Sequence, residues 1–145
     1  MLHYTFLITL AVTAFQQPLQ TQSVHIPEKL KGRSVVLVGI IDLDADKKND
    51  LRLFRRRLIA SGVKSIPFVN HEGILTDGNL NKDTMFIVVG TLSDPAQAKN
   101  ACEKKAARKA IKTYLGLRKR ARKLGIRAVS AKDFALYVGY KTESK

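Results

Sequence analysis

The apolar residues of this chain gather in short unbroken runs separated by polar segments. Residues 34–41 are mostly Val, Leu and Ile, and residues 85–89 are apolar throughout. Runs of this kind are typical of strands that are buried on both faces of a parallel sheet. Residues 63–69 and 126–130 are less regular and predict two further strands.

Helical periodicity fills the intervals between these strands. Residues 49–60 begin with an Asn-Asp pair that can cap a helix, and they carry apolar side chains on one face and most arginines on the other. A second helix is expected over residues 94–124, because aspartate followed by proline is a start signal and glycine follows at the end. This helix would be roughly 30 residues long. Residues 131–138 predict a short closing helix.

The predicted element order is β-α-β-β-α-β-α. Right-handed crossovers then require a four-stranded, mainly parallel sheet flanked by helices, which is an α/β architecture with an unusually long second helix. A chain of 145 residues suffices for one such domain and a short extension. We therefore expect one α/β domain over residues 30–141.

Residues 1–23 stand apart because they contain no Lys, Arg, Asp or Glu. Within them, residues 4–15 are largely apolar and residues 16–23 form a polar linker, as in a secretory signal, although the usual positive start is missing. The apolar run is also shorter than the roughly 20 residues that span a bilayer. A signal or membrane-attachment segment and an element that packs on the domain both remain open. The protein is accordingly expected to be exported or membrane-associated, or else cytoplasmic or nucleoid.

The charge of the chain adds a second observation. Lys and Arg number 26 against 12 Asp and Glu, a net charge of +14, which attracts polyanions. Between Pro95 and Leu124, eleven Lys and Arg are opposed only by Glu103. Apolar residues at three-to-four spacing form a stripe along this helix: Ala98, Cys102, Ala106, Ala110, Tyr114, Leu117, Ala121 and Leu124. Eight of the basic residues fall opposite this stripe, and we call them the basic ridge: Lys104, Lys105, Arg108, Lys109, Lys112, Lys119, Arg122 and Lys123.

The basic ridge and Lys99, near the expected start of the helix, predict a polyanion-binding surface. Neutralisation of phosphates by such a ridge would give salt-dependent, largely sequence-independent binding of nucleic acid. An acidic protein segment or an anionic membrane also fits a basic amphipathic helix, and a merely solvated face is the remaining alternative. Base stacking is not indicated, since Tyr114 is the helix's one aromatic residue and lies on its apolar side.

A group of aspartates after the first predicted strand has the spacing of a calcium loop. Hard cations require several oxygen ligands, and the pattern resembles Asp-rich calcium loops and EF-hand-like sites. Lys47 stands where such a loop usually has glycine, and Leu53 stands where an EF-hand has its bidentate glutamate. Helix capping by the same acids is the alternative. The candidate ligands are Asp42, Asp44, Asp46 and Asp50.

Catalytic chemistry finds little support in the sequence. His3, His25 and His71 are not tied by spacing to a nucleophile or to a metal set. Cys102 is the only cysteine, which excludes an intrachain disulfide, and we expect it to be a small core residue. We therefore expect no enzymatic activity, no small-molecule substrate and no cofactor other than the candidate calcium ion.

Three segments together resemble a BRCT domain. Residues 31–39 (Lys-Gly-Arg-Ser-Val-Val-Leu-Val-Gly) resemble the opening strand of that family, in which glycine follows at once. Residues 85–90 (Met-Phe-Ile-Val-Val-Gly) resemble its third strand. Residues 124–134 (Leu-Gly-Ile-Arg-Ala-Val-Ser-Ala-Lys-Asp-Phe) are similar to the end of the BRCT domain of bacterial NAD-dependent DNA ligases. The resemblance covers residues 30–141.

This resemblance implies a non-enzymatic binding module. Phosphopeptide readers of the family hold phosphate with a Ser or Thr just before the first-strand glycine, where this chain has Val38, and with a Lys for which Lys99 is the candidate. Valine has no hydroxyl to donate, so the expected partner is a polyanion in general: nucleic acid, or an acidic or phosphorylated protein segment. The rival hypothesis is an exported or membrane-tethered structural domain that binds calcium through its aspartate loop.

Overall fold

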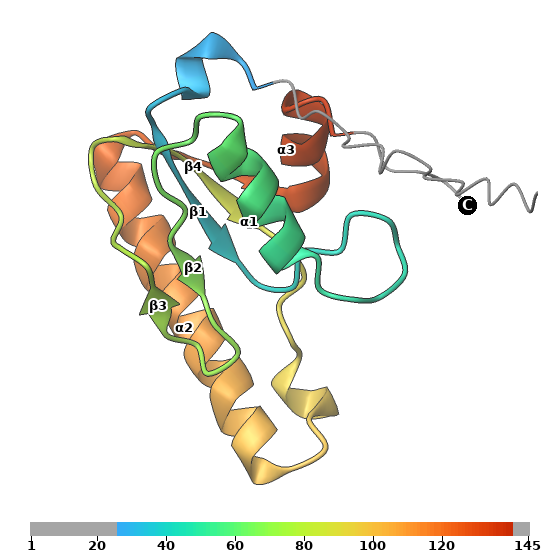
Figure 1. The fold of residues 1–145 in the computed structure, drawn as a ribbon. Helices are drawn as coiled ribbons and strands as arrows, with labels where there is room; N and C mark the ends of the chain where they lie inside the picture. Colours follow the sequence, from blue (N-terminus) through green and yellow to red (C-terminus); the bar gives the residue numbers. More distant parts are fainter. Residues whose placement is uncertain (1–25, 141–145) are drawn as a thin grey trace, which may run out of the picture.

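The computed structural model describes residues 26–140 (Figure 1). Residues 1–23, for which a signal or a packed element was expected, lie outside this range, as does residue 141. Two short 3₁₀ helices, three α-helices and five strands occur in the order η1 (Glu28–Leu30), β1 (Ser34–Val38), α1 (Leu51–Ala60), β2 (Phe68–Val69), β3 (Leu75–Thr76), β4 (Thr84–Val89), η2 (Pro95–Gln97), α2 (Ala101–Leu124), β5 (Arg127–Ser130) and α3 (Ala131–Tyr137).

The strands form one five-stranded mixed sheet in the order β3-β2-β1-β4-β5. Strand β1 runs parallel to β2 and β4, and β4 runs parallel to β5, whereas β3 is antiparallel to β2. The α/β class is confirmed, but the prediction of four strands was wrong. The fifth strand forms because the Asn70 side chain accepts the N–H groups of Glu72 and Ile74 and turns the chain back.

Helices cover both faces of the sheet, with α1 and α3 on one face and α2 on the other (Figure 1). Alternate residues of β1 serve the two cores, because successive side chains of a strand point to opposite faces. Val35 and Leu37 pack with Phe54 of α1 and with α3, whereas Val36 and Val38 pack with α2. All five residues of β1 are buried. The unbroken apolar run that predicted this strand reflects burial on both sides.

The long second helix was predicted to start at Asp94, and it starts later. Asp94 caps only η2, by accepting the N–H of Ala96. Helix α2 has its own cap, in which the Asn100 side chain accepts the N–H of Glu103. The Glu103 carboxylate in turn accepts the N–H of Lys99, much as in a capping box. Helix α2 is therefore 24 residues long, or about 36 Å.

Two glycines allow the chain to close behind β1 and β4. After these strands the backbones of Ile40 and Thr91 exchange two hydrogen bonds, at 2.8 and 2.9 Å. A Cβ atom on Gly90 would lie 2.0 Å from the Ile40 carbonyl oxygen, and Gly39 has a φ of +84°. Only glycine tolerates both the approach and the dihedral angle.

Helix α2 is long but highly charged, and the other helices are short. Within residues 26–140 no helix combines the length and the apolar character needed to cross a membrane.

Replacement of Phe134 by alanine should strongly destabilise the fold. The Phe134 ring is 1% exposed, and its centroid lies 6.0 Å from that of Phe54 and 5.7 Å from that of Phe86. We expect Phe134→Ala to lower the free energy of unfolding by about 3–5 kcal/mol. Leu136→Ala on the same helix should change it by less than about 0.5 kcal/mol, because Leu136 is 70% exposed. Urea denaturation tests both, and similar losses would contradict this packing.

Candidate functional site

The basic ridge forms one continuous exposed face of α2. The helix buries Ala107, Leu117 and Ala121 toward the sheet, and at about 100° per residue the eight ridge residues point the opposite way. All eight are exposed, and in the described part of the chain none of them forms an ion pair. Helix α2 carries ten Lys and Arg and one acid, Glu103. The structure therefore brings all eight ridge residues together.

Three other basic residues are placed differently. Arg120 donates to the Leu80 carbonyl at 3.3 Å, and Arg118 lines a small pocket beside β5. Lys99 lies outside α2, one residue before its Asn100 cap. The expectation that Lys99 belongs to the second helix was wrong, because the cap at Asn100 starts the helix beyond it.

The ridge weakens the helix on which it lies. Like charges four residues apart repel, as in Lys104–Arg108 and Lys105–Lys109, and each such pair costs about 0.2–0.5 kcal/mol. Arg122 and Lys123 are an exception, because both stand in the last turn, where the helix dipole favours positive charge. Helix stability therefore does not explain most of the ridge, whereas a bound anion would relieve the repulsion.

The aspartate loop brings three of its four predicted ligands together. Asp42, Asp44 and Asp50 each offer a carboxylate oxygen, and these oxygens lie within 4.8 Å of one another. Asp46 is not part of this group, because its carboxylate accepts the Lys48 N–H at 2.8 Å and pairs with the Lys48 ammonium at 3.3 Å. The hydrogen bond from the Lys48 N–H holds the pKa of Asp46 below its ordinary value, and the Lys48 ammonium adds to this effect.

The grouped aspartates are largely engaged with the loop itself. Asp42 accepts the N–H of Lys47 at 3.0 Å, and Asp50 accepts that of Leu43 at 2.9 Å. Asp50 holds the N-cap position of helix α1, but its side chain makes no capping hydrogen bond; the N–H of Leu51 is accepted by the Asn49 side chain instead. The second oxygen of Asp42, Oδ1, is buried and has no hydrogen-bond partner in the described structure. Hydrogen bonding at the start of the helix therefore accounts for Asn49 but leaves this oxygen of Asp42 unexplained.

Lys47 has a φ of +64°, in the left-handed region that favours glycine. Calcium loops usually have glycine at this position of the loop. The backbone thus takes the turn that such loops take, although the residue type differs.

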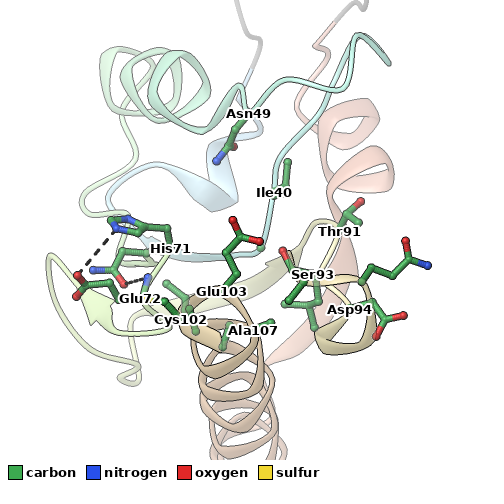
Figure 2. A pocket seen from close by; sticks show the side chains of 18 residues that line it. Ile40, Asn49, His71, Glu72, Thr91, Ser93, Asp94, Cys102, Glu103 and Ala107 are labelled. Carbon is green, nitrogen blue, oxygen red and sulfur yellow. Dashed lines mark hydrogen bonds and ion pairs between the residues drawn. The ribbon is translucent and has the colours of Figure 1, made fainter. Parts of the chain in front are cut away.

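An acidic pocket lies beside the place where the resemblance put a phosphate site, but neither Val38 nor Lys99 lines it. Val38 is fully buried, and beyond it a cavity of about 750 Å³ opens between the end of β1 and the first turns of α2 (Figure 2). Glu72, Asp94 and Glu103 line it, and its lining contains no Lys or Arg. Cys102, expected in the core, is exposed and lines this cavity, because α2 extends past the sheet at its N-terminal end (Figure 1).

Sequence reasoning missed this pocket, because its walls come from five separate segments of the chain. The local signal was the departure of Glu103 from an otherwise basic helix. Comparison of the chain with protein-family models, with curated proteins and with solved structures found no match. The function is therefore argued from the residues and their geometry.

Substitution of one ridge residue by glutamate should stabilise the protein. Lys109→Glu removes the repulsion between Lys105 and Lys109 and replaces it with an attraction, so we expect the free energy of unfolding to rise by about 0.5–1 kcal/mol. The gain should shrink in about 0.5 M salt, where the charges are screened. Lys82→Glu, an equal change of charge at an exposed residue outside α2, is the control. Urea denaturation that shows no gain for Lys109→Glu would refute the repulsion.

Proposed function

We propose that this chain is a non-enzymatic, BRCT-like binding module that holds a polyanion, foremost nucleic acid, on the basic ridge of α2. The observation that carries the proposal is the ridge itself: eight exposed Lys and Arg lie on one helix face, and none of the eight forms an ion pair with a described residue. The fold supports the family resemblance, because apart from β3 its elements follow the order β-α-β-β-α-β-α with four parallel strands.

The dimensions of the ridge suit a duplex backbone. From Lys104 to Lys123 it extends about 28 Å along the helix axis. At one base pair per roughly 3.4 Å this corresponds to about eight base pairs, enough to reach several phosphates. The ridge offers point charges and no aromatic side chain, so it would bind the backbone and leave the bases unread.

Specific phosphoserine binding in the family's usual place is not part of the proposal. Val38 is buried and has no hydroxyl, and the neighbouring pocket carries Glu72, Asp94 and Glu103. These carboxylates would repel a phosphate. The anion is therefore assigned to the ridge, on the opposite side of α2.

Binding of duplex DNA over a salt series tests the proposal. The variant Lys104→Glu, Lys105→Glu, Arg108→Glu, Lys109→Glu should bind roughly 30-fold more weakly or worse. Its slope of log affinity against log salt should fall by about 3–4, because each lost phosphate contact removes about 0.9. The control variant makes the same total change of charge at exposed residues outside α2: Arg52→Glu, Arg56→Glu, Lys82→Glu, Lys132→Glu.

The control should retain most of the affinity and the slope. Equal losses in the two variants would mean that net charge, and not the ridge, binds DNA, and unaltered affinity in the ridge variant would refute the proposal. Competition by polyglutamate at matched charge distinguishes the partner: a polyglutamate that displaces DNA at equal concentration would favour an acidic protein segment.

A second candidate function is calcium binding in a structural domain. The convergence of Asp42, Asp44 and Asp50 favours it, together with the buried, unpaired oxygen of Asp42. A hard cation takes several such oxygens and would offset the repulsion between the three carboxylates.

Calcium should then stabilise the wild type. With an affinity typical of weak sites, about 10 mM calcium would raise the free energy of unfolding by about 1–3 kcal/mol. Asp44→Asn should abolish this gain, whereas Asp46→Asn in the same loop should keep it, because Asp46 lies outside the group. Thermal unfolding with calcium and with magnesium measures the effect. Stabilisation that is absent, or equal in the two variants, would remove this candidate.

A further inference from the structure

The acidic pocket described above lies at the N-terminal end of α2 on the side away from the basic ridge. Its walls are Gly39 and Ile40 just after β1, Asn49, the turn at residues 69–72, the segment at residues 91–98 and the first turns of α2 (Figure 2). Its volume, about 750 Å³, falls within the range of roughly 300–1,000 Å³ that is usual for ligand sites. The hydrogen bonds between Ile40 and Thr91 join two of the walls.

The surface inside the pocket is largely apolar. Ala106, Ala107 and Ala110 of α2 contribute small side chains that leave room above the helix, and Val69 also lines the pocket. Ile40 also lines the pocket and is 37% exposed, which is high for so large an apolar side chain. Covering these atoms would remove apolar surface from water, which is favourable.

The charge of the pocket is opposite to that of the chain. Three carboxylates, Glu72, Asp94 and Glu103, line it without any Lys or Arg, in a chain of net charge +14. His71 also lines the pocket, and its Nε2 lies 4.0 Å from the Glu72 carboxylate (Figure 2). Asp94 and Glu103 have no basic side chain paired to them among the described residues. Figure 2 shows the Glu103 side chain directed into the middle of the pocket. Its hydrogen bond comes from a neutral backbone N–H, that of Lys99, so its negative charge is not neutralised there. The pocket therefore repels the polyanions that the ridge attracts.

We propose that this pocket binds a short segment of another protein in which an apolar side chain stands next to Lys or Arg. The apolar side chain fills the space above the alanines of α2, and the cationic side chain pairs with Glu103 and Glu72. Charge complementarity selects this class of partner. A second copy of the chain is disfavoured, because two chains of +14 repel each other. The inference does not depend on the proposed function of the ridge, since it uses the other face of α2.

Titration of the ¹⁵N-labelled full chain with synthetic peptides, followed by NMR, tests the proposal. The probe is acetyl-Gly-Arg-Leu-Lys-Phe-Gly-amide. One matched peptide replaces Arg and Lys by Glu, and a second replaces Leu and Phe by Ser. We expect the probe to shift the amide signals of Ile40, Glu72 and Ala106, and both matched peptides to leave them unshifted. The acidic peptide should instead shift signals of the ridge.

Glu72→Gln with Glu103→Gln should weaken the probe's binding by about threefold to tenfold, as expected for two partly exposed ion pairs. Glutamine still accepts the Lys99 N–H, so the helix cap is kept. The control, Glu28→Gln with Asp83→Asn, makes the same change of charge outside the pocket and should leave binding unaltered. A second variant, Ala106→Phe, fills the pocket and should abolish binding. Thermal unfolding and the spectra of the free variants verify that they fold.

Four outcomes would overturn the proposal. The first three are the absence of shifts at the pocket with about 1 mM probe, equal binding of the probe and the acidic peptide at the pocket, and an unaltered affinity in the Glu72→Gln, Glu103→Gln variant. Binding of the Ser-substituted peptide as tight as that of the probe would also count against it, because charge alone would then suffice.

Discussion

The burial of β1 on both faces is the constraint on which the rest of the structure depends. Its four apolar residues divide between two cores, one closed by α1 and α3 and the other by α2. A strand buried in this way requires a helix layer on each side, so α2 must lie along the sheet with one narrow apolar face turned inward. The outward face of α2 is thereby left free for other purposes, and the basic ridge lies there.

Helix α2 presents different chemistry on its different sides. Toward the sheet it is apolar, with Ala107, Leu117 and Ala121 buried. Its outer face is basic, and at its N-terminal end the side that faces the segment at residues 91–98 carries Glu103 beside a row of alanines. The part of α2 that extends past the sheet has no core to cover, which is why a cavity opens there. One helix can thus separate an anionic partner from a cationic one.

The break before α2 shows how far local signals reach. An aspartate followed by proline at residues 94–95 is a good start signal, and it does start a helix, but only the single turn η2. The backbone is then extended at Ala98 and at Asn100, and Asn100 and Glu103 form a second cap from which α2 starts. Either cap was compatible with the sequence. Asp46 is a similar case: its spacing is that of a calcium ligand, but in the structure its carboxylate is paired with Lys48.

The sequence by itself determined the features that depend on neighbours within a few residues. Runs of Val, Leu and Ile predicted the strands, and the period of α2 placed all eight ridge residues on one face. The pairing of β3 with β2 and the grouping of Asp42, Asp44 and Asp50 each lie within nine residues of chain, but their outcome depends on which local hydrogen bonds form, and the sequence did not show this. The tertiary structure alone decided the exposure of Cys102 and the acidic pocket, because a residue's exposure and charge partners depend on which distant segments the fold brings beside it.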